Sequence, residues 1–108
     1  MPSIINRVKN HTKNSTLLSN YIFEDNKLSA RAMGLYCYLI HLPEDQKISK
    51  TEIITHFKEG QKAMNTAFKE LETFGYLSKE KTKQNGQFTG WKYTLYTFPN
   101  NFIKDFSN

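Results

Sequence analysis

Apolar residues recur at helical spacing through the first two-thirds of the chain. Residues 29–42 are apolar on almost every side, with Ser29 as a favourable N-cap and Pro43 closing the far end. We therefore expect this segment to be the buried central helix. The preceding segment, Thr16–Phe23, is apolar enough to cover one side of a core as a short helix, and residues 25–27 have the composition of a turn.

A second helix is predicted where Ser49-Lys50-Thr51-Glu52 has the S-x-x-E form of a capping box. In a capping box the Ser hydroxyl and the Glu carboxylate satisfy amide groups at the start of a helix. We expect this helix to run to His56 or Phe57 and to bury Ile53, Ile54 and Phe57. The sequence of residues 58–60, which ends in glycine, should then break it.

A third helix is predicted from Gln61 to Phe74, because its apolar residues recur at spacings of three and four. Gly75 stands where a left-handed C-cap belongs. The apolar stripe that should face the core consists of Met64, Ala67, Phe68, Leu71 and Phe74.

The hydrophobic period changes after Gly75. Tyr76–Lys83 and Phe88–Phe98 are rich in aromatic residues and Thr, and the Asn85-Gly86 pair between them is a strong hairpin signal. Ile48 is expected in a short strand that joins this hairpin. The fold class is thus mainly α with a small antiparallel β-sheet, and the order of its elements, a three-helix core followed by a β-hairpin wing, is that of a winged helix-turn-helix. We place a basic arm at residues 1–15, the domain at 16–98 and a tail at 99–108.

The net charge of the 108-residue chain is +5, and its distribution is uneven. Residues 1–14 carry Arg7, Lys9 and Lys13 and no acid, while residues 76–92 carry four lysines against Glu80. Clusters of positive charge are what a polyanionic partner requires, because neutralised phosphates release their counterions. A solvated surface with a solubility bias explains a net charge of this size almost as well.

Several function classes are disfavoured. Cys37 is the single cysteine, so a reducing compartment is expected, and the sequence shows neither a signal peptide nor a membrane span; we expect a cytoplasmic protein. Cys37 and His41 lie four residues apart, but two ligands do not make a zinc site, and Cys37 is interpreted as a core residue. With no catalytic or phosphate-loop motif present, we expect no enzymatic activity, no metal and no cofactor.

The residues left outside the apolar stripe of the third helix are candidates for DNA contact. They carry amide, hydroxyl and amine groups that can bond base edges and phosphates, and they are Gln61, Lys62, Asn65, Thr66 and Lys69. The alternative is an ordinary solvated helix face.

The predicted hairpin adds a second basic group. Lys79, Lys81 and Lys83 share one side of their strand, and Asn85 lies at the tip, where a wing would follow the phosphate backbone. Alternating lysines on an edge strand are also a common guard against aggregation. Trp91, Tyr93 and Tyr96 could stack on unpaired bases, but we expect them to close the sheet over the core.

Parts of the chain resemble a known family. These are LSARAMGLYCYLIHLPED at residues 28–45, GQKA at 60–63, LETFGYL at 71–77 and GWKY at 90–93. Over roughly residues 16–98 the chain resembles the N-terminal winged-helix domains of replication initiators and replisome organisers from Gram-positive phages, plasmids and genomic islands. The resemblance implies binding to origin or regulatory DNA, with Gln61, Lys62, Asn65 and Lys69 at recognition-helix positions. Family members often continue into a domain that engages helicase-loading machinery, whereas this sequence ends ten residues after Phe98.

The sequence therefore predicts a sequence-specific double-stranded DNA-binding protein of a mobile genetic element, acting in replication initiation or gene regulation. Two alternatives stay open. One is a winged helix that docks on a host or phage protein, including replication proteins, and the other is a single-stranded DNA-binding accessory protein. A homodimer is compatible with either role, and no membrane partner is expected.

Overall fold

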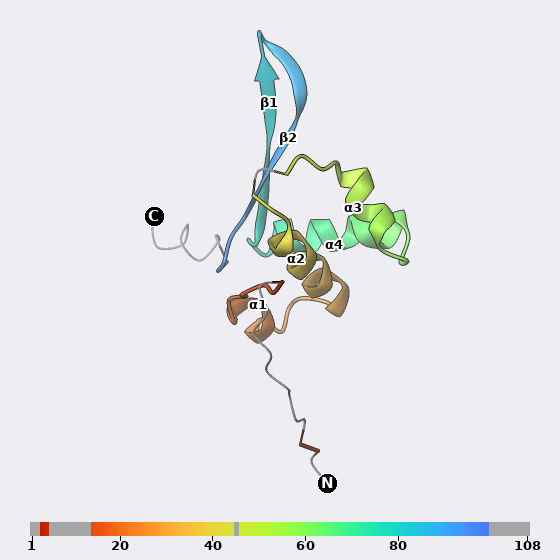
Figure 1. Cartoon of the computed structure of the whole chain (residues 1–108), viewed down its shortest axis with the longest axis vertical. Helices are drawn as coiled ribbons and strands as arrows, with labels where there is room; N and C mark the ends of the chain where they lie inside the picture. Colours follow the sequence, from red (N-terminus) through yellow and green to blue (C-terminus); the bar gives the residue numbers. More distant parts are fainter. Residues whose placement is uncertain (1–2, 5–13, 45, 100–108) are drawn as a thin grey trace.

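The computed structural model describes residues 3–4, 14–44 and 46–99. In these ranges the chain forms four helices and one two-stranded antiparallel sheet, which confirms the predicted α+β class. The helices lie together, with α1 beside one end of α2, and the β1–β2 ribbon projects away from them (Figure 1). The elements are α1 (Tyr21–Glu24), α2 (Ala30–His41), α3 (Lys50–His56), α4 (Gln61–Thr73), β1 (Leu77–Gln84) and β2 (Gln87–Leu95).

Two predicted terminal segments fall largely outside this description. The proposed basic arm has only residues 3–4 and 14–15 within it, and the proposed tail has only Pro99. Among the helices that are described, none has the length and apolar content that a membrane span requires.

Two of the predicted helix starts are confirmed in detail, whereas the helix expected over Thr16–Phe23 begins only at Tyr21, and Leu17 is exposed. The Ser29 hydroxyl accepts a hydrogen bond of 3.1 Å from the backbone N–H of Ala32 at the start of α2. At α3 both halves of the capping box form: the Glu52 N–H donates to the Ser49 hydroxyl at 3.1 Å, and the Ser49 N–H donates to the Glu52 carboxylate at 3.4 Å. These bonds satisfy amide groups that have no partner within the first helical turn.

The predicted breaks between elements are also confirmed. Gly60, with φ of 91°, separates α3 from α4, and Gly75, with φ of 87°, follows the last turn of α4. The Tyr76 N–H donates back to the Leu71 carbonyl at 2.9 Å, which is the 6→1 hydrogen bond of a Schellman motif. The chain can therefore turn sharply from α4 into β1.

The core lies between α2 and α4 and is closed by α1, α3 and the base of the ribbon. The stripe predicted for α4 is buried except for Phe74, which is half-buried. Phe57, predicted as buried, is likewise only half-buried at the end of α3. The buried set is Ile22, Leu28, Ala32, Leu35, Tyr36, Ile53, Ile54, Met64, Ala67, Phe68, Leu71, Tyr76 and Leu77.

The ribbon turns through Asn85 and Gly86, whose φ angles of 55° and 79° belong to a type I′ turn. The expected third strand at Ile48 is wrong: residues 46–49 form no strand, and the sheet of the described chain has two strands. The reason is local, because the Gln46 N–H donates to the Pro43 carbonyl at 3.1 Å and the Ser49 N–H is used by the capping box. Ile48 packs against the core by its side chain alone.

Two buried tyrosines attach the ribbon and α1 to the helices. The Tyr36 hydroxyl donates to the Tyr96 carbonyl at 2.8 Å, just beyond the end of β2. The Tyr76 hydroxyl can donate a hydrogen bond to the Asp25 carboxylate at 3.0 Å or to the Tyr21 carbonyl at 3.3 Å. Burial raises the pKa of both phenols, and the neighbouring Asp25 carboxylate raises the pKa of Tyr76 further.

We expect stability to fall in alkaline solution. The raised pKa of Tyr36 and Tyr76 means that the folded protein holds these protons more tightly than the unfolded chain, whose phenols titrate near pH 10. Their contribution is present below about pH 10 and is lost as the pH rises toward the folded-state pKa values. Urea unfolding between neutral pH and about pH 11 measures this. Tyr76→Phe should flatten the decline, and a wild-type profile that stays level would contradict the burial of these hydroxyls.

Phe68→Ala should destabilise the fold by about 3–5 kcal/mol through lost burial and a residual cavity. Phe68 is only 2% exposed and belongs to the buried core, with its ring 6.1 Å from that of Tyr93. The matched control is Phe23→Ala, because Phe23 is 51% exposed and its removal should change stability by less than about 0.5 kcal/mol. Chemical denaturation compares the two, and equal effects would mean that the stripe of α4 does not form the core.

Candidate nucleic-acid interface

The structure places the candidate residues of α4 on one exposed face. Met64, Ala67, Phe68 and Leu71 point into the core, which leaves the other side of the helix to solvent. The Thr66 hydroxyl donates to the Lys62 carbonyl at 3.1 Å, one turn earlier. The exposed residues brought together here, which we call the outer face of α4, are Gln61, Lys62, Asn65, Thr66 and Lys69.

The two carboxylates of α4 are engaged by neighbouring elements. Glu70 accepts a hydrogen bond of 2.5 Å from the Ser29 hydroxyl at the start of α2. Glu72 forms an ion pair of 3.6 Å with Lys79 at the base of β1. Both acids are therefore held against the protein, and the outer face of α4 contributes amides, a hydroxyl and ammonium groups.

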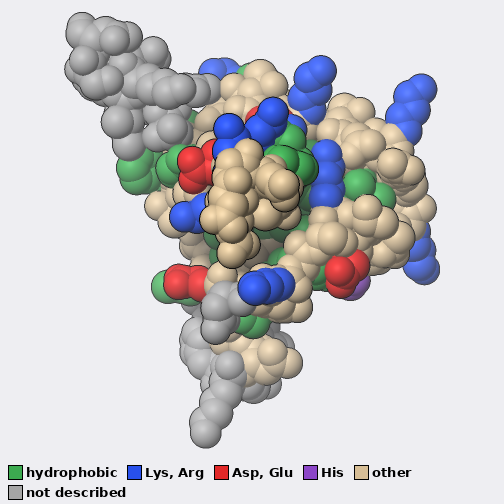
Figure 2. Space-filling view, turned by 90° about the horizontal axis from the view of Figure 1, so that it is seen from above, with side chains coloured by type: hydrophobic (Ala, Val, Ile, Leu, Met, Phe, Trp, Pro, Cys, Tyr) green, Lys and Arg blue, Asp and Glu red, His purple; other side chains and the backbone are tan. Residues whose placement is uncertain are grey.

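The candidate residues of the ribbon lie on a separate element. Lys79, Lys81 and Lys83 are exposed along β1, and Asn85 is exposed in the turn at the tip. Seen from the tip, Lys and Arg side chains project at several places around the ribbon (Figure 2). Lys79 is tied to Glu72 near the base, so the uncompensated charge of β1 lies toward the tip.

The three candidate aromatic residues, two in β2 and Tyr96 just after it, have different surroundings. Tyr93 is half-buried with its ring 6.1 Å from that of Phe68, and the half-buried Tyr96 shares a hydrogen bond of 3.0 Å with Ser78. The expectation that Trp91 covers the core is wrong, because Trp91 is 46% exposed. The upper part of the ribbon projects away from the helices (Figure 1), and the neighbours of the Trp91 ring are Phe88 and the lysines of β1.

A β-bulge in β2 also escaped the sequence interpretation. Thr82 pairs with Gly90 and Lys83 pairs with Phe88, so Thr89 is an extra residue in the ladder. The backbone at Gly90, with φ of 150°, favours a residue without a side chain. The available signal was this glycine inside a strand pattern, which often marks a bulge. As a result Phe88 joins Trp91, at a ring distance of 5.6 Å.

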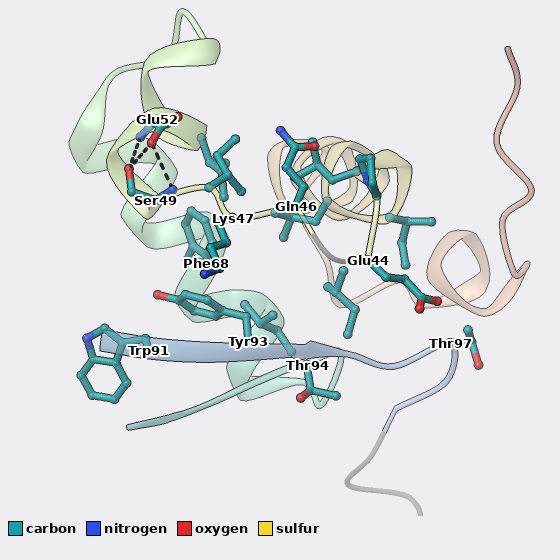
Figure 3. A pocket seen from close by; sticks show the side chains of 18 residues that line it. Glu44, Gln46, Lys47, Ser49, Glu52, Phe68, Trp91, Tyr93, Thr94 and Thr97 are labelled. Atoms are coloured by element: carbon teal, nitrogen blue, oxygen red, sulfur yellow. Dashed lines mark hydrogen bonds between the residues drawn. The ribbon is translucent and has the colours of Figure 1, made fainter. Parts of the chain in front are cut away.

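A groove of about 970 Å³ lies between β2 and the segment that joins α2 to α3. Tyr93 and Phe68 lie side by side in its wall, and Trp91 stands at the end toward the ribbon tip (Figure 3). Glu44 and Glu52 line it together with Lys47. Charges of both signs give the groove no preference for an anion such as phosphate.

The part of the chain that is described contains no group of three His, Cys, Asp or Glu side chains that could hold a metal ion. Cys37 is half-buried, and burial raises the pKa of its thiol. The Nδ1 atom of His41 lies 2.7 Å from the Tyr38 carbonyl of the preceding turn. Cys37 and His41 of α2 therefore belong to no such group of three among the described residues.

Comparison of the chain with models of protein families, with curated proteins and with solved structures found no match.

Proposed function

We propose that this protein is a winged helix that binds double-stranded DNA, with α4 in the major groove and the β1–β2 ribbon as its wing. The order α2, α3, turn, α4 and hairpin is the order of that fold, and the sharp turn at Gly60 sets α4 apart from α3. The proposed biological role is replication initiation or gene regulation in a mobile genetic element, which rests on the sequence resemblance.

The observation that carries the proposal is the acid-free outer face of α4. Duplex DNA repels carboxylates, and this helix directs Glu70 to Ser29 and Glu72 to Lys79 while it exposes Gln61, Asn65 and Lys69. Amide side chains can form paired hydrogen bonds with adenine in the major groove, and ammonium groups bind phosphates. A helix face that only served solubility would not need its acids withdrawn.

Affinity for duplex DNA should fall steeply with salt. Contacts between about five cations and phosphates give a slope near −4 to −5 in a plot of log affinity against log salt concentration. Titration of a labelled duplex at several salt concentrations measures the slope. Affinity that does not change with salt, or no binding at low salt, would favour a protein-docking winged helix instead.

Mutations in α4 and in the β1–β2 ribbon should change DNA binding in different ways. Replacing Gln61 and Asn65 with Ala should erase discrimination between sites, since each such contact is worth about 1–3 kcal/mol against the wrong base. Replacing Lys79, Lys81 and Lys83 with Gln should weaken preferred and scrambled duplexes by a similar factor and reduce the salt slope by up to about three.

Binding titrations on a preferred and a scrambled duplex, at two salt concentrations, separate these effects. Lys58→Gln controls for the loss of one lysine charge, because Lys58 is exposed and belongs to neither candidate group, and its effect should be less than about a third of that of the triple variant. If the lysine variant loses specificity and the Gln61/Asn65 variant keeps it, the ribbon recognises the DNA sequence and the assignment of that role to α4 is wrong.

A further inference from the structure

The two faces of the β1–β2 ribbon differ in chemistry. Residues 79, 81 and 83 lie on the same side of β1, and cross-strand partners share a face. Because of the bulge at Thr89, Phe88 lies across from Lys83 on this same face. One face, which we call the lysine–aromatic face, therefore carries the pairs Lys79–Tyr93, Lys81–Trp91 and Lys83–Phe88.

The opposite face of the ribbon is polar and balanced in charge. Glu80 lies across from Lys92, and the hydroxyls of Thr82 and Thr89 share a hydrogen bond of 2.9 Å. Three of the four lysines of the ribbon thus belong to the lysine–aromatic face. An anion with apolar parts is attracted to that face and not to the other.

The aromatic rings of this face become more exposed toward the tip. Tyr93 is half-buried against Phe68, Trp91 is 46% exposed and Phe88 is 56% exposed. Phe88 and Trp91 contact each other edge to face but contribute nothing to the core. Two large rings that remain in water beside lysines are poorly explained by stability alone.

Two lysines lie over the Trp91 ring as cation–π partners. The Nζ atom of Lys79 lies 5.0 Å from the ring centroid, and that of Lys81 lies 6.0 Å away. Rings that can stack on bases, with ammonium groups beside them for phosphates, are the combination used for unpaired nucleotides. Alternate residues of a strand are about 7 Å apart, which suits one lysine for each phosphate of an extended strand.

We infer that the lysine–aromatic face binds single-stranded DNA, with bases stacking on Phe88 and Trp91 and phosphates paired with Lys81 and Lys83. A duplex cannot supply such a ligand because its bases are stacked on one another. The site is separate from the outer face of α4, so the inference does not rest on duplex binding. Lys81 and Lys83 also belong to the proposed wing, so a single strand on this face and a duplex against the wing would compete for these two lysines.

Trp91 is the single tryptophan of the chain and reports on the site directly. A short oligothymidylate should quench its fluorescence in a saturable manner, and less so at high salt. Phe88→Ala should weaken this binding by at least about fivefold through the loss of one stacking ring. Trp91→Ala, followed by anisotropy of a labelled oligothymidylate, should have an effect of similar size.

Two control variants match these changes. Phe23→Ala removes a ring that is 51% exposed on α1, and Lys92→Gln removes a lysine from the opposite face of the ribbon, to be compared with Lys81→Gln. Neither control should change the quenching by more than about twofold, since neither residue belongs to the proposed site. Thermal melts of all variants should coincide with wild type, because the mutated side chains lie outside the core.

Three results would overturn the inference. The first is no quenching, and the second is equal weakening by Phe88→Ala and Phe23→Ala. The third is a concentration-dependent shielding of Trp91 without DNA, which would mean that a second copy of the chain covers this face. The Gln61/Asn65 variant should still bind oligothymidylate, so failure of duplex binding and failure of single-strand binding can be told apart.

Discussion

The edge-to-face contact between Tyr36 and Tyr76 joins parts of the chain that are far apart in sequence. Their ring centroids lie 5.8 Å apart, with Tyr36 on α2 and Tyr76 at the junction of α4 and β1. Each hydroxyl then reaches another segment, Tyr36 to the end of β2 and Tyr76 to the turn after α1. Because both groups are buried and paired, α1 and the ribbon are fixed to the helices by hydrogen bonds that water cannot readily replace.

Much of this fold follows from local sequence signals. Ser29, the Ser49 capping box, Gly60, Gly75 and the Asn85-Gly86 turn each act within a few residues, so each boundary could be predicted from the sequence. The apolar pattern does not show why Ile48 lies outside a strand, because the reason is a set of backbone hydrogen bonds to other partners. Backbone donors near Ile48 are taken by Pro43 and Glu52 before any strand can use them.

The candidate site was only partly predictable. The exposed side of α4 follows from its apolar stripe, but the withdrawal of Glu70 and Glu72 depends on Ser29 and Lys79, which only tertiary structure brings near. Trp91 is exposed because it lies on the part of the ribbon that extends past the helices. The length of that extension could not be predicted from residue types. A strand pattern taken alone also places Phe88 and Trp91 on opposite faces, since they are three residues apart.

The bulge results from the unequal lengths of the two strands. The core fixes Leu77 opposite Leu95, and the Asn85-Gly86 turn fixes Gln84 opposite Gln87, yet the eight residues of β1 must match the nine of β2. One residue must leave the ladder, and Gly90 makes the region beside it the easiest place. Bulges bend and twist a strand, so the unequal strand lengths help to set the direction in which the ribbon tip points. Insertions or deletions of one residue would therefore redirect the ribbon more than most substitutions.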